Sequence, residues 1–431
     1  MQPHDIEAYL AKRHHDQLYR APVVVRPDGR WLWHDNQRYL NMAGNDYLGL
    51  AHDATLAAQT AELALDYPAG STGSPLITGY HPVHAALIED LCQWLGVEDV
   101  VLFSSGFAAN QAMLQSLWGP QDTLLLDKKC HASMMDVLPR QTDSRASGPA
   151  YKRFHHNDVA HVESLLIALA EKQRQPQEVA AATTHALAAV VATEGVFSMD
   201  GDSPDLAALV QLCQRYQVPL LLDDAHGVGV LGPEGQGTMA AQGLRHAQLQ
   251  CLMANFGKAV GASGGFLAGS SRVMDYLRNS ARHYIYSTAP SPLLAASLRC
   301  HIQAVRTEAW RRDKLAANIH YFKAKAAAYG LPLLDSATAI QPLLLGESRR
   351  ALQMAQQLRH QGIWTTAIRP PTVPINSARL RLTLTALHEP QDLDHLVTAL
   401  ARTQDELAVQ DRHQIQGHDE HNLNLGESYD R

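Results

Sequence analysis

Short apolar runs alternate with amphipathic stretches through the middle of the chain. The runs occupy residues 100–103, 123–126, 188–192 and 219–222, and each is followed by a turn that contains Gly or Asp. Between the last two runs, Asp205–Tyr216 has the spacing of an amphipathic helix. Because strands buried on both faces have continuous apolar sequences, the pattern predicts βα units. The expected fold class is therefore α/β, with a mostly parallel sheet covered by helices.

Other patterns occur at the two ends of the chain. A helix is predicted over Asp5–Arg20, and the apolar segments 31–33 and 39–42 flank a polar turn, as in a β-hairpin. Beyond Pro290, Ala- and Leu-rich helices and short apolar strands are typical of a smaller α+β domain. Its predicted elements are helices over 292–328, strands at 340–345, 364–368 and 379–385, and a helix at 391–409.

These changes of pattern divide the chain into four parts. Residues 1–44 form a helix and hairpin segment, and 45–289 form the large α/β domain. Residues 290–410 form the C-terminal α+β domain. The remaining residues, 411–431, have almost no large apolar side chains, so a disordered tail is expected there.

Composition and charge narrow the function classes. With 46% hydrophobic and 18% charged residues among 431, the chain has the make-up of a soluble globular protein. A net charge of −7 gives no reason to expect a nucleic acid or an anionic membrane as partner. No apolar stretch is long enough to span a bilayer. The five cysteines form no CxxC pair and no HExxH motif occurs, so we expect a cytoplasmic location and no metal.

Lys258 is the first candidate for chemistry. It is the only lysine between Lys172 and Lys314, and it lies among small and apolar residues. Desolvation in such a place disfavours the charged ammonium and makes the amine a better nucleophile toward an aldehyde. The alternative is a solvated lysine in a glycine-rich turn.

Asp223 and His226 form the second candidate, directly after the apolar run 219–222. Ligands of open α/β sheets bind at the carboxyl ends of the strands. A buried carboxylate there needs a cationic partner, and a pyridinium nitrogen would serve. The bound ring would then act as an electron sink, and His226 could reach its phenolic oxygen. Asp223 could instead cap the following turn.

Two further segments complete the set. Ser104-Ser105-Gly106-Phe107 leads from a predicted strand into a helix, whose first backbone N–H groups could bind a phosphate. Plain capping by one of the serines would produce the same pattern. His131, after the run at 123–126, could stack on a planar ring or lie on the surface.

Two nucleotide-binding motifs can be dismissed. Gly227–Gly232 matches GxGxxG, but a Pro- and Gly-rich turn follows instead of a helix. Gly257-Lys258 is not part of a Walker A loop, because Ala259 replaces the required Ser or Thr and Leu252 replaces the first glycine.

Several segments, taken in order, resemble those of the α-oxoamine synthases. These are pyridoxal-phosphate enzymes of fold type I that condense an amino acid with an acyl thioester. The resemblance covers roughly the first 410 residues. It is carried by NDYLGL (45–50), SSGFAANQA (104–112), TEGVFSMDGD (193–202), DDAHGVGVLG (223–232), FGKAVGASGG (256–265), IYST (285–288), AIRPPTVP (367–374) and ARLRLTLT (378–385).

The resemblance implies pyridoxal 5'-phosphate as cofactor. Lys258 would carry it as a Schiff base, Asp223 would pair with its pyridine nitrogen, and His131 would stack on its ring. His226 and Ser198 would lie near the phenolic oxygen. The implied cofactor residues are Gly106, Phe107, His131, Ser198, Asp223, His226, Asn255 and Lys258, with Lys258, His131, Asp223 and His226 as the catalytic set.

Four residues are implied in substrate binding. Arg381 would anchor the amino-acid carboxylate, because a guanidinium can bind a carboxylate through two hydrogen bonds. Thr372 and Arg369 would lie near the acyl substrate. Arg20 is the nearest counterpart of the family's N-terminal substrate arginine, and Tyr19 competes for that position.

The sequence departs from the family at two places. Asn255 stands where the family has Thr or Ser, three residues before the lysine; its amide N–H can also donate to a phosphate. The segment Gly70–Pro75 differs from the family's GSGGS pattern, near the expected substrate entrance.

Within the family, the chain is most similar to the branch that condenses L-alanine with a pimeloyl thioester in biotin synthesis. The acyl donor would be pimeloyl-CoA or a pimeloyl-carrier protein, and Lys258 would also remove the Cα proton. The alternatives are family members that use glycine or serine with a different acyl group, an aminotransferase of the same fold, and a catalytically silent protein. The resemblance further implies a homodimer in which Ser287 and Thr288 reach the cofactor phosphate of the other subunit.

Overall fold

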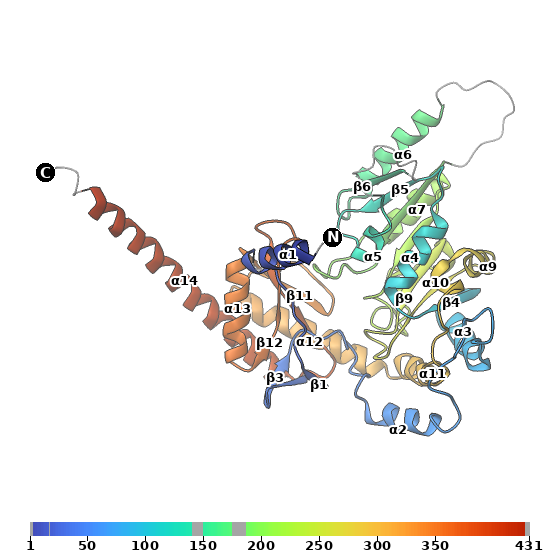
Figure 1. The fold of residues 1–431 in the computed structure, drawn as a ribbon, viewed down its shortest axis with the longest axis horizontal. Helices are drawn as coiled ribbons and strands as arrows, with labels where there is room; N and C mark the ends of the chain where they lie inside the picture. Colours follow the sequence, from blue (N-terminus) through green and yellow to red (C-terminus); the bar gives the residue numbers. More distant parts are fainter. Residues whose placement is uncertain (1–2, 17, 140–149, 175–186, 427–431) are drawn as a thin grey trace.

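The computed structural model describes residues 3–16, 18–139, 150–174 and 187–426. Within these residues, a seven-stranded sheet of order β4-β10-β9-β8-β7-β5-β6 forms the centre of the large domain (Figure 1). The strands are β4 (Asp99–Phe103), β5 (Thr123–Asp127), β6 (Ala150–Phe154), β7 (Ala189–Glu194), β8 (Leu220–Asp223), β9 (Cys251–Asn255) and β10 (Gly265–Gly269). Neighbouring strands are parallel except at β10, which is antiparallel to both β4 and β9.

Helices cover this sheet, and apolar side chains from its two faces enter two separate core clusters. In β5, Leu125 belongs to one cluster, whereas Leu124 and Leu126 belong to the other. This burial on both faces explains the continuous apolar runs and confirms the predicted α/β fold. The helices of this domain are α2 (Ala54–Leu63), α3 (Pro82–Leu95), α4 (Gly106–Leu117), α5 (Ala132–Met135), α6 (Val159–Arg174), α7 (Leu206–Tyr216), α8 (Thr238–Ala241), the 3₁₀ turn His246–Gln248, α9 (Ser271–Ser280) and α10 (Arg282–Ile285).

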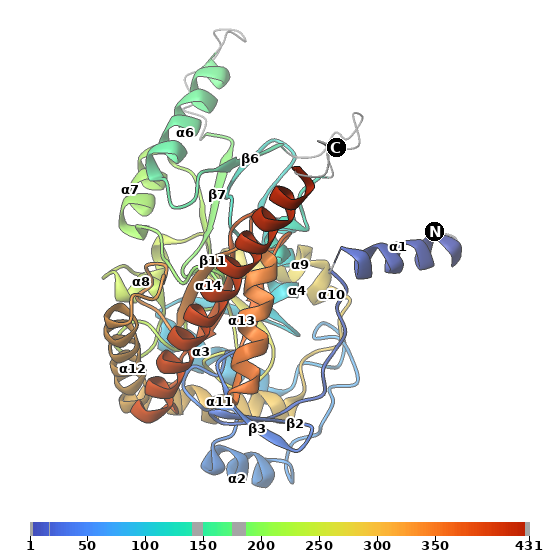
Figure 2. The same cartoon turned by 90° about the vertical axis from the view of Figure 1, so that its left-hand side faces the viewer.

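The C-terminal part is built on the three-stranded sheet β11-β14-β13 and the helices beside it, seen from another side in Figure 2. Its strands are β11 (Ile340–Gly346), β13 (Thr366–Ile368) and β14 (Ala378–Thr383), and its helices are α12 (Ala309–Ala328), α13 (Ser348–His360) and α14 (Pro390–Gly426). Helix α11 (Pro292–Thr307), which follows the expected boundary at residue 290, packs instead against α2 and α3 of the large domain. One predicted strand, 364–368, is in fact two. Its first part pairs with an N-terminal strand and its second part with β14, so the chain changes sheet at Thr365.

The N-terminal segment contains helix α1 (Pro3–His15) and the predicted hairpin. Strands β1 (Arg26–Asp28), β2 (Trp31–His34) and β3 (Gln37–Asn41) form a sheet with β12 (Ile363–Trp364). Asp35 and Asn36 turn the hairpin with φ of 48° and 60°, the left-handed conformation that a tight two-residue turn requires. This sheet joins the first residues of the chain to its C-terminal domain.

Helix α14 is longer than the sequence pattern predicts. It continues past Val409 to Gly426 and projects away from the domains in Figure 1, so the expected disordered tail is helical over 411–426. No proline interrupts this segment, and extending an existing helix avoids the cost of nucleation. The last residues of the expected tail, 427–431, lie outside the described part of the chain. Among the described residues, no helix combines the length and apolarity needed to cross a bilayer.

Candidate functional site

A cavity of about 170 Å³ opens where several strands of the large sheet end. Glu194, Asp223 and Asn255 are the last residues of β7, β8 and β9, and Gly106 begins α4. Because parallel strands end at the same edge, side chains from distant parts of the sequence meet here. The cavity is lined by Gly106, Phe107, Asn110, His131, Ser133, Glu194, Asp223, Ala225, His226, Met253, Asn255 and Lys258.

Seven of the residues singled out from the sequence line this cavity. They are Gly106, Phe107, His131, Asp223, His226, Asn255 and Lys258. Ser198, Arg381, Arg369, Thr372 and Arg20 are not in its lining. The predicted cofactor residues are thus gathered around one cavity with the exception of Ser198.

Asp223 is a buried carboxylate held by neutral donors. Its Oδ2 accepts a hydrogen bond of 2.6 Å from Asn110 Nδ2, and its Oδ1 accepts one of 3.0 Å from the Ala225 amide. Among the described residues, no cationic side chain forms an ion pair with it. A buried carboxylate needs such a partner, and the protonated ring nitrogen of a pyridine fits the requirement.

Lys258 lies half-buried in the cavity wall. Burial lowers the pKa of its amine, the negative charges of Asp223 and Glu194 partly oppose this, and the result is about 8. No described residue forms a hydrogen bond or ion pair with its Nζ atom. The amine is therefore directed to the cavity and is partly neutral near physiological pH, as a covalent cofactor anchor requires.

Two histidines in the cavity wall are held in the neutral form. Burial, and then the charge of Lys258, lowers the pKa of His226 well below its usual value, and its Nδ1 lies 2.6 Å from the Tyr47 hydroxyl. Burial also lowers the pKa of His131, whose Nδ1 lies 2.8 Å from Ser133 Oγ. A neutral imidazole held in this way can stack on a planar ring without a charge to desolvate.

The start of α4 provides backbone donors for an anion. Ser105 caps the helix, its hydroxyl accepting the Ala108 N–H at 3.1 Å, so the capping alternative is also realised. The N–H groups of Gly106 and Phe107 donate to no described residue. Asn255 packs against Gly106, with its Oδ1 accepting the Gly257 N–H at 3.1 Å. Its Nδ2 is left as a donor beside the helix start, which suits a phosphate.

Arg381, on β14, lies close to the cavity without lining it. Its Nε donates to the Ser198 carbonyl at 2.6 Å, and its two Nη atoms donate to Asn45 Oδ1 at 3.1 Å and Thr383 Oγ1 at 3.2 Å. Its positive charge contributes to the lowered pKa of both Lys258 and His226. The guanidinium is therefore near the reactive amine and is oriented by three acceptors.

Two of the remaining predicted residues, Arg369 and Thr372, lie in the loop after β13. The Thr372 N–H donates to the Arg369 carbonyl at 3.1 Å. Burial, followed by the positive charge of Arg20, lowers the pKa of Arg369. The N-terminal Arg20 and the C-terminal Arg369 are thus close enough in space for their charges to interact.

Sequence reasoning missed several residues of the cavity wall. Asn110 and Ser133, together with Glu194, Ala225 and Met253, line it as well. Glu194 is fully buried at the end of β7, and it accepts the backbone N–H of His131. An acidic residue that ends a predicted buried strand is the same signal that identified Asp223, so it could have been found. Asn110 shows no such signal.

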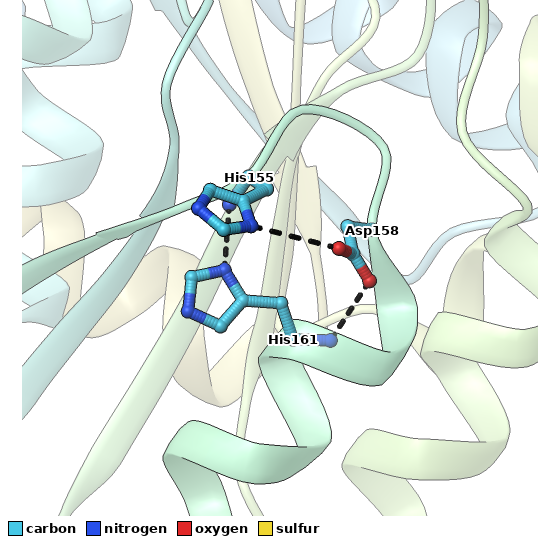
Figure 3. Close-up of side chains that lie close together, drawn as sticks. All are labelled: His155, Asp158 and His161. Carbon is cyan, nitrogen blue, oxygen red and sulfur yellow. Dashed lines mark hydrogen bonds and ion pairs between the residues drawn. The ribbon is translucent and has the colours of Figure 1, made fainter.

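Within the described part of the chain, two groups of His and Asp side chains lie close enough together for an ion to bridge them by distance alone. In the first, shown in Figure 3, His161 Nδ1 accepts the His155 backbone N–H and Asp158 Oδ1 accepts the His161 N–H, both at 2.9 Å. With Nδ1 used as an acceptor, the proton of the neutral His161 ring lies on Nε2, which opposes metal binding at that nitrogen. These contacts form the start of α6. The second group contains His156, Asp200 and Asp202.

The amine, the buried carboxylate and the anion cradle define a pyridoxal-phosphate enzyme of fold type I. Residues 37–400 match the family described as aminotransferase class I and II, and the chain belongs to this family. Its cofactor is pyridoxal 5'-phosphate, and its function is of the α-oxoamine synthase type.

Solved structures of such enzymes are similar over almost the whole chain. Serine palmitoyltransferase from S. paucimobilis, with a bound PLP–myriocin aldimine, is 25% identical with a TM-score of 0.81, over 94% of this chain and 98% of its own. The Sphingomonas wittichii serine palmitoyltransferase is also 25% identical, with a TM-score of 0.82 and the same coverage. The 8-amino-7-oxononanoate synthase of Francisella tularensis is 22% identical over 86% of this chain and 99% of its own, with a TM-score of 0.70, and it supports the fold alone.

Proposed function

We propose that this chain is an 8-amino-7-oxononanoate synthase. It condenses L-alanine with a pimeloyl thioester, from CoA or an acyl carrier protein, and releases CO₂ and the free thiol. The five cysteines are free, which fits the reducing cytoplasm as its location. The choice of a pimeloyl group rests on the proximity of Arg20 to Arg369.

Each of these cavity residues has a separate role in binding the cofactor. Lys258 would hold it covalently and Asp223 would pair with its ring nitrogen, while Asn110 orients Asp223. His131 would stack on the ring, and His226, with Ser198, would lie near its phenolic oxygen. The helix start at Gly106 and Phe107, with Asn255, receives the phosphate. When bound, the cofactor supplies an electron sink for negative charge at the amino-acid Cα.

Lys258 and Arg381 act on the amino acid. With a pKa of about 8, the Lys258 amine is matched to accepting a proton from Cα near neutral pH. Arg381 binds the carboxylate and sets the direction of the Cα–H bond. Its remaining hydrogen bonds, to Ser198 and Asn45, keep the guanidinium in place.

Arg20 and Arg369 suit an acyl chain that ends in a charge. The positive charge of Arg20 makes protonation of Arg369 less favourable, so an anion placed between the two guanidinium groups would be stabilised. A pimeloyl chain carries a carboxylate at its far end, whereas a simple fatty acyl chain does not. Thr372, which follows Arg369 in the same loop, is a further acyl contact.

Replacing Arg369 tests this assignment. Arg369→Ala should raise the KM for pimeloyl-CoA by about tenfold or more, because a charge-assisted hydrogen bond is lost. The KM for L-alanine should stay as in the wild type. Heptanoyl-CoA, which has no distal carboxylate, is the matched control, and the variant should use it as well as the wild type does. An equal loss with both thioesters would contradict a role in recognising the carboxylate.

A second candidate is an acyltransferase that uses serine and a long-chain thioester. The greater similarity to serine palmitoyltransferase structures favours it. Turnover of alanine, glycine and serine, each with pimeloyl-CoA, pimeloyl-carrier protein and palmitoyl-CoA, separates the two when products are identified by mass spectrometry. The proposal expects 8-amino-7-oxononanoate from alanine and pimeloyl thioester. A product formed only from serine and palmitoyl-CoA would overturn it.

We also infer that the active form is a homodimer. Large apolar side chains are exposed in the segment before α3 and around α9 and α10, where a second copy could cover them. They are Leu65, Leu76, Ile77, Tyr80, Tyr276 and Tyr286. In such a dimer, Ser287 and Thr288 reach the cofactor phosphate of the other subunit.

A further inference from the structure

His156, two residues after β6, lies between two carboxylates. Its Nδ1 is 3.0 Å from Asp127 Oδ1 and its Nε2 is 2.7 Å from Asp202 Oδ2. Because a carboxylate accepts hydrogen bonds, both ring nitrogens must donate, so the ring is an imidazolium. These two bonds raise the pKa of His156 to about 9, against the opposing effect of burial.

Each partner of this imidazolium is itself fixed. Asp127 is fully buried at the end of β5, and it also accepts the backbone N–H groups of Lys129 and Asn157, each at 2.8 Å. Asp202 Oδ2 accepts a second bond of 3.0 Å from Asn157 Nδ2. The imidazolium therefore connects the sheet to the loop that carries Asp202.

That loop runs from Phe197 to Asp202 and closes on itself. The Phe197 N–H donates to the Asp202 carbonyl at 2.9 Å, and the Gly201 N–H donates to the Phe197 carbonyl at 2.8 Å. The Phe197 and His156 rings pack nearly perpendicular to each other, with 4.4 Å between ring centroids. Within this closed loop lies Ser198, whose carbonyl accepts the bond from Arg381 Nε.

A second set of charges ties the same loop to β14. Asp200, next to Gly201, forms ion pairs with both Arg379 and Lys129. Arg379 and Arg381 are alternate residues of β14, so both hold the loop from the C-terminal domain. These pairs also explain why His156, Asp200 and Asp202 lie together without requiring a metal.

We propose that His156 is a positioning residue that fixes the loop 197–202, and through the Ser198 carbonyl the guanidinium of Arg381. The inference rests on the proposed role of Arg381 in binding the amino-acid carboxylate. His156 does not line the cavity, and its effect is on the direction in which Arg381 presents its donors.

Two variants with a matched control test this. His156→Gln retains a polar side chain but removes the positive charge between the two carboxylates, and Asp202→Asn keeps the shape of one partner while removing its charge. Each should raise the dissociation constant and the KM for the amino acid by about tenfold, with kcat and the affinity for the cofactor changed by less than about threefold. His155→Gln, on the neighbouring residue outside this network, should behave as the wild type.

A measurement without catalysis accompanies the kinetics. Nitrogen NMR of histidine-labelled protein should show an imidazolium signal at pH 7.5, with both nitrogens protonated, that is missing in His156→Gln and present in His155→Gln. A neutral His156, or folded variants with wild-type affinity for the amino acid, would overturn the inference alone. Wild-type protein that binds none of alanine, glycine and serine would instead overturn the proposed function, and the inference with it.

Discussion

The reactivity of Lys258 results from opposing effects on one amine. Burial in the cavity wall lowers its pKa, and the carboxylates of Asp223 and Glu194 keep it from falling further than about 8. Roughly a tenth of the amine is then neutral at pH 7, compared with far less for an exposed lysine. The surroundings therefore give this lysine a larger neutral, nucleophilic fraction near pH 7 than an exposed lysine has.

This balance predicts a pH profile. Acetylation of Lys258 in the cofactor-free protein should rise with pH and level off above about 8, as the amine loses its proton. Competitive labelling followed by mass spectrometry measures it, with the exposed Lys152 in the same digest as a reference amine. Asp223→Asn removes the largest opposing charge, so its midpoint should move to lower pH. A profile unaffected by that change would contradict the assigned electrostatics.

The raised pKa of His156 predicts that its contribution to stability depends on pH. Its pKa rises from 6.5 to about 9 on folding, so its contribution is complete below about pH 6.5 and is lost as pH rises through about 9. The ionisable groups that face it are Asp127 and Asp202. The difference in melting temperature between wild type and His156→Gln should therefore shrink between pH 6.5 and 9.5. A difference that is constant with pH would argue against the imidazolium.

The sequence was informative about those site residues whose chemistry differs from their surroundings. An isolated lysine, and an aspartate that ends an apolar run, can be recognised from the order of the residues alone. Asn110 could not be recognised in this way, because a polar residue in a helix is ordinary until its contact with Asp223 is seen. For Arg381, the sequence alone offered only the family resemblance.

At the scale of elements, strand β10 passes very close to the start of helix α4, which forms part of the cavity wall. A methyl group on Gly265 would lie 2.7 Å from the Gly106 backbone nitrogen and 2.9 Å from the Ser105 carbonyl carbon. Gly265→Ala should therefore push β10 away from the start of α4. We expect a loss of about 1–3 kcal/mol of stability from overpacking, together with weaker cofactor binding.

Thermal unfolding and cofactor titration measure the two effects. Gly257→Ala is the matched control, since the nearest atom to its added methyl would be 3.8 Å away, and its melting temperature should not change. If Gly265→Ala binds the cofactor normally despite a lower melting temperature, the close approach matters for stability only.

The strands that the sequence analysis identified as continuous apolar runs were predicted well. Strands whose pairing depends on tertiary contacts were not. The buried runs became β4, β5, β7 and β8 within a residue or two. Strand β10 is rich in small residues, and no apolar run indicates it. The division of 364–368 between two sheets follows from which neighbours each half finds, and this cannot be read from the segment itself.

At the scale of the whole molecule, the exposed apolar surface predicts self-association. Wild-type protein should sediment as a dimer, and Ile77→Asp should yield a monomer, because a charge would be buried in the interface. Ile77 is 80% exposed in the single chain. Tyr329→Asp, at an exposed residue after α12, is the control and should remain dimeric. A monomeric wild type with full turnover would refute the proposed dimer.

The cavity is built from the ends of several strands, so it can form only after those strands have come together. Its wall is drawn from residues 106–258, so no shorter piece of the chain contains the complete site. A growing or partly folded chain would offer the cofactor an ordinary solvated lysine, without the carboxylate and the helix start that select it. Cofactor capture should therefore be a late event, and its absorbance would report that the cavity wall is complete.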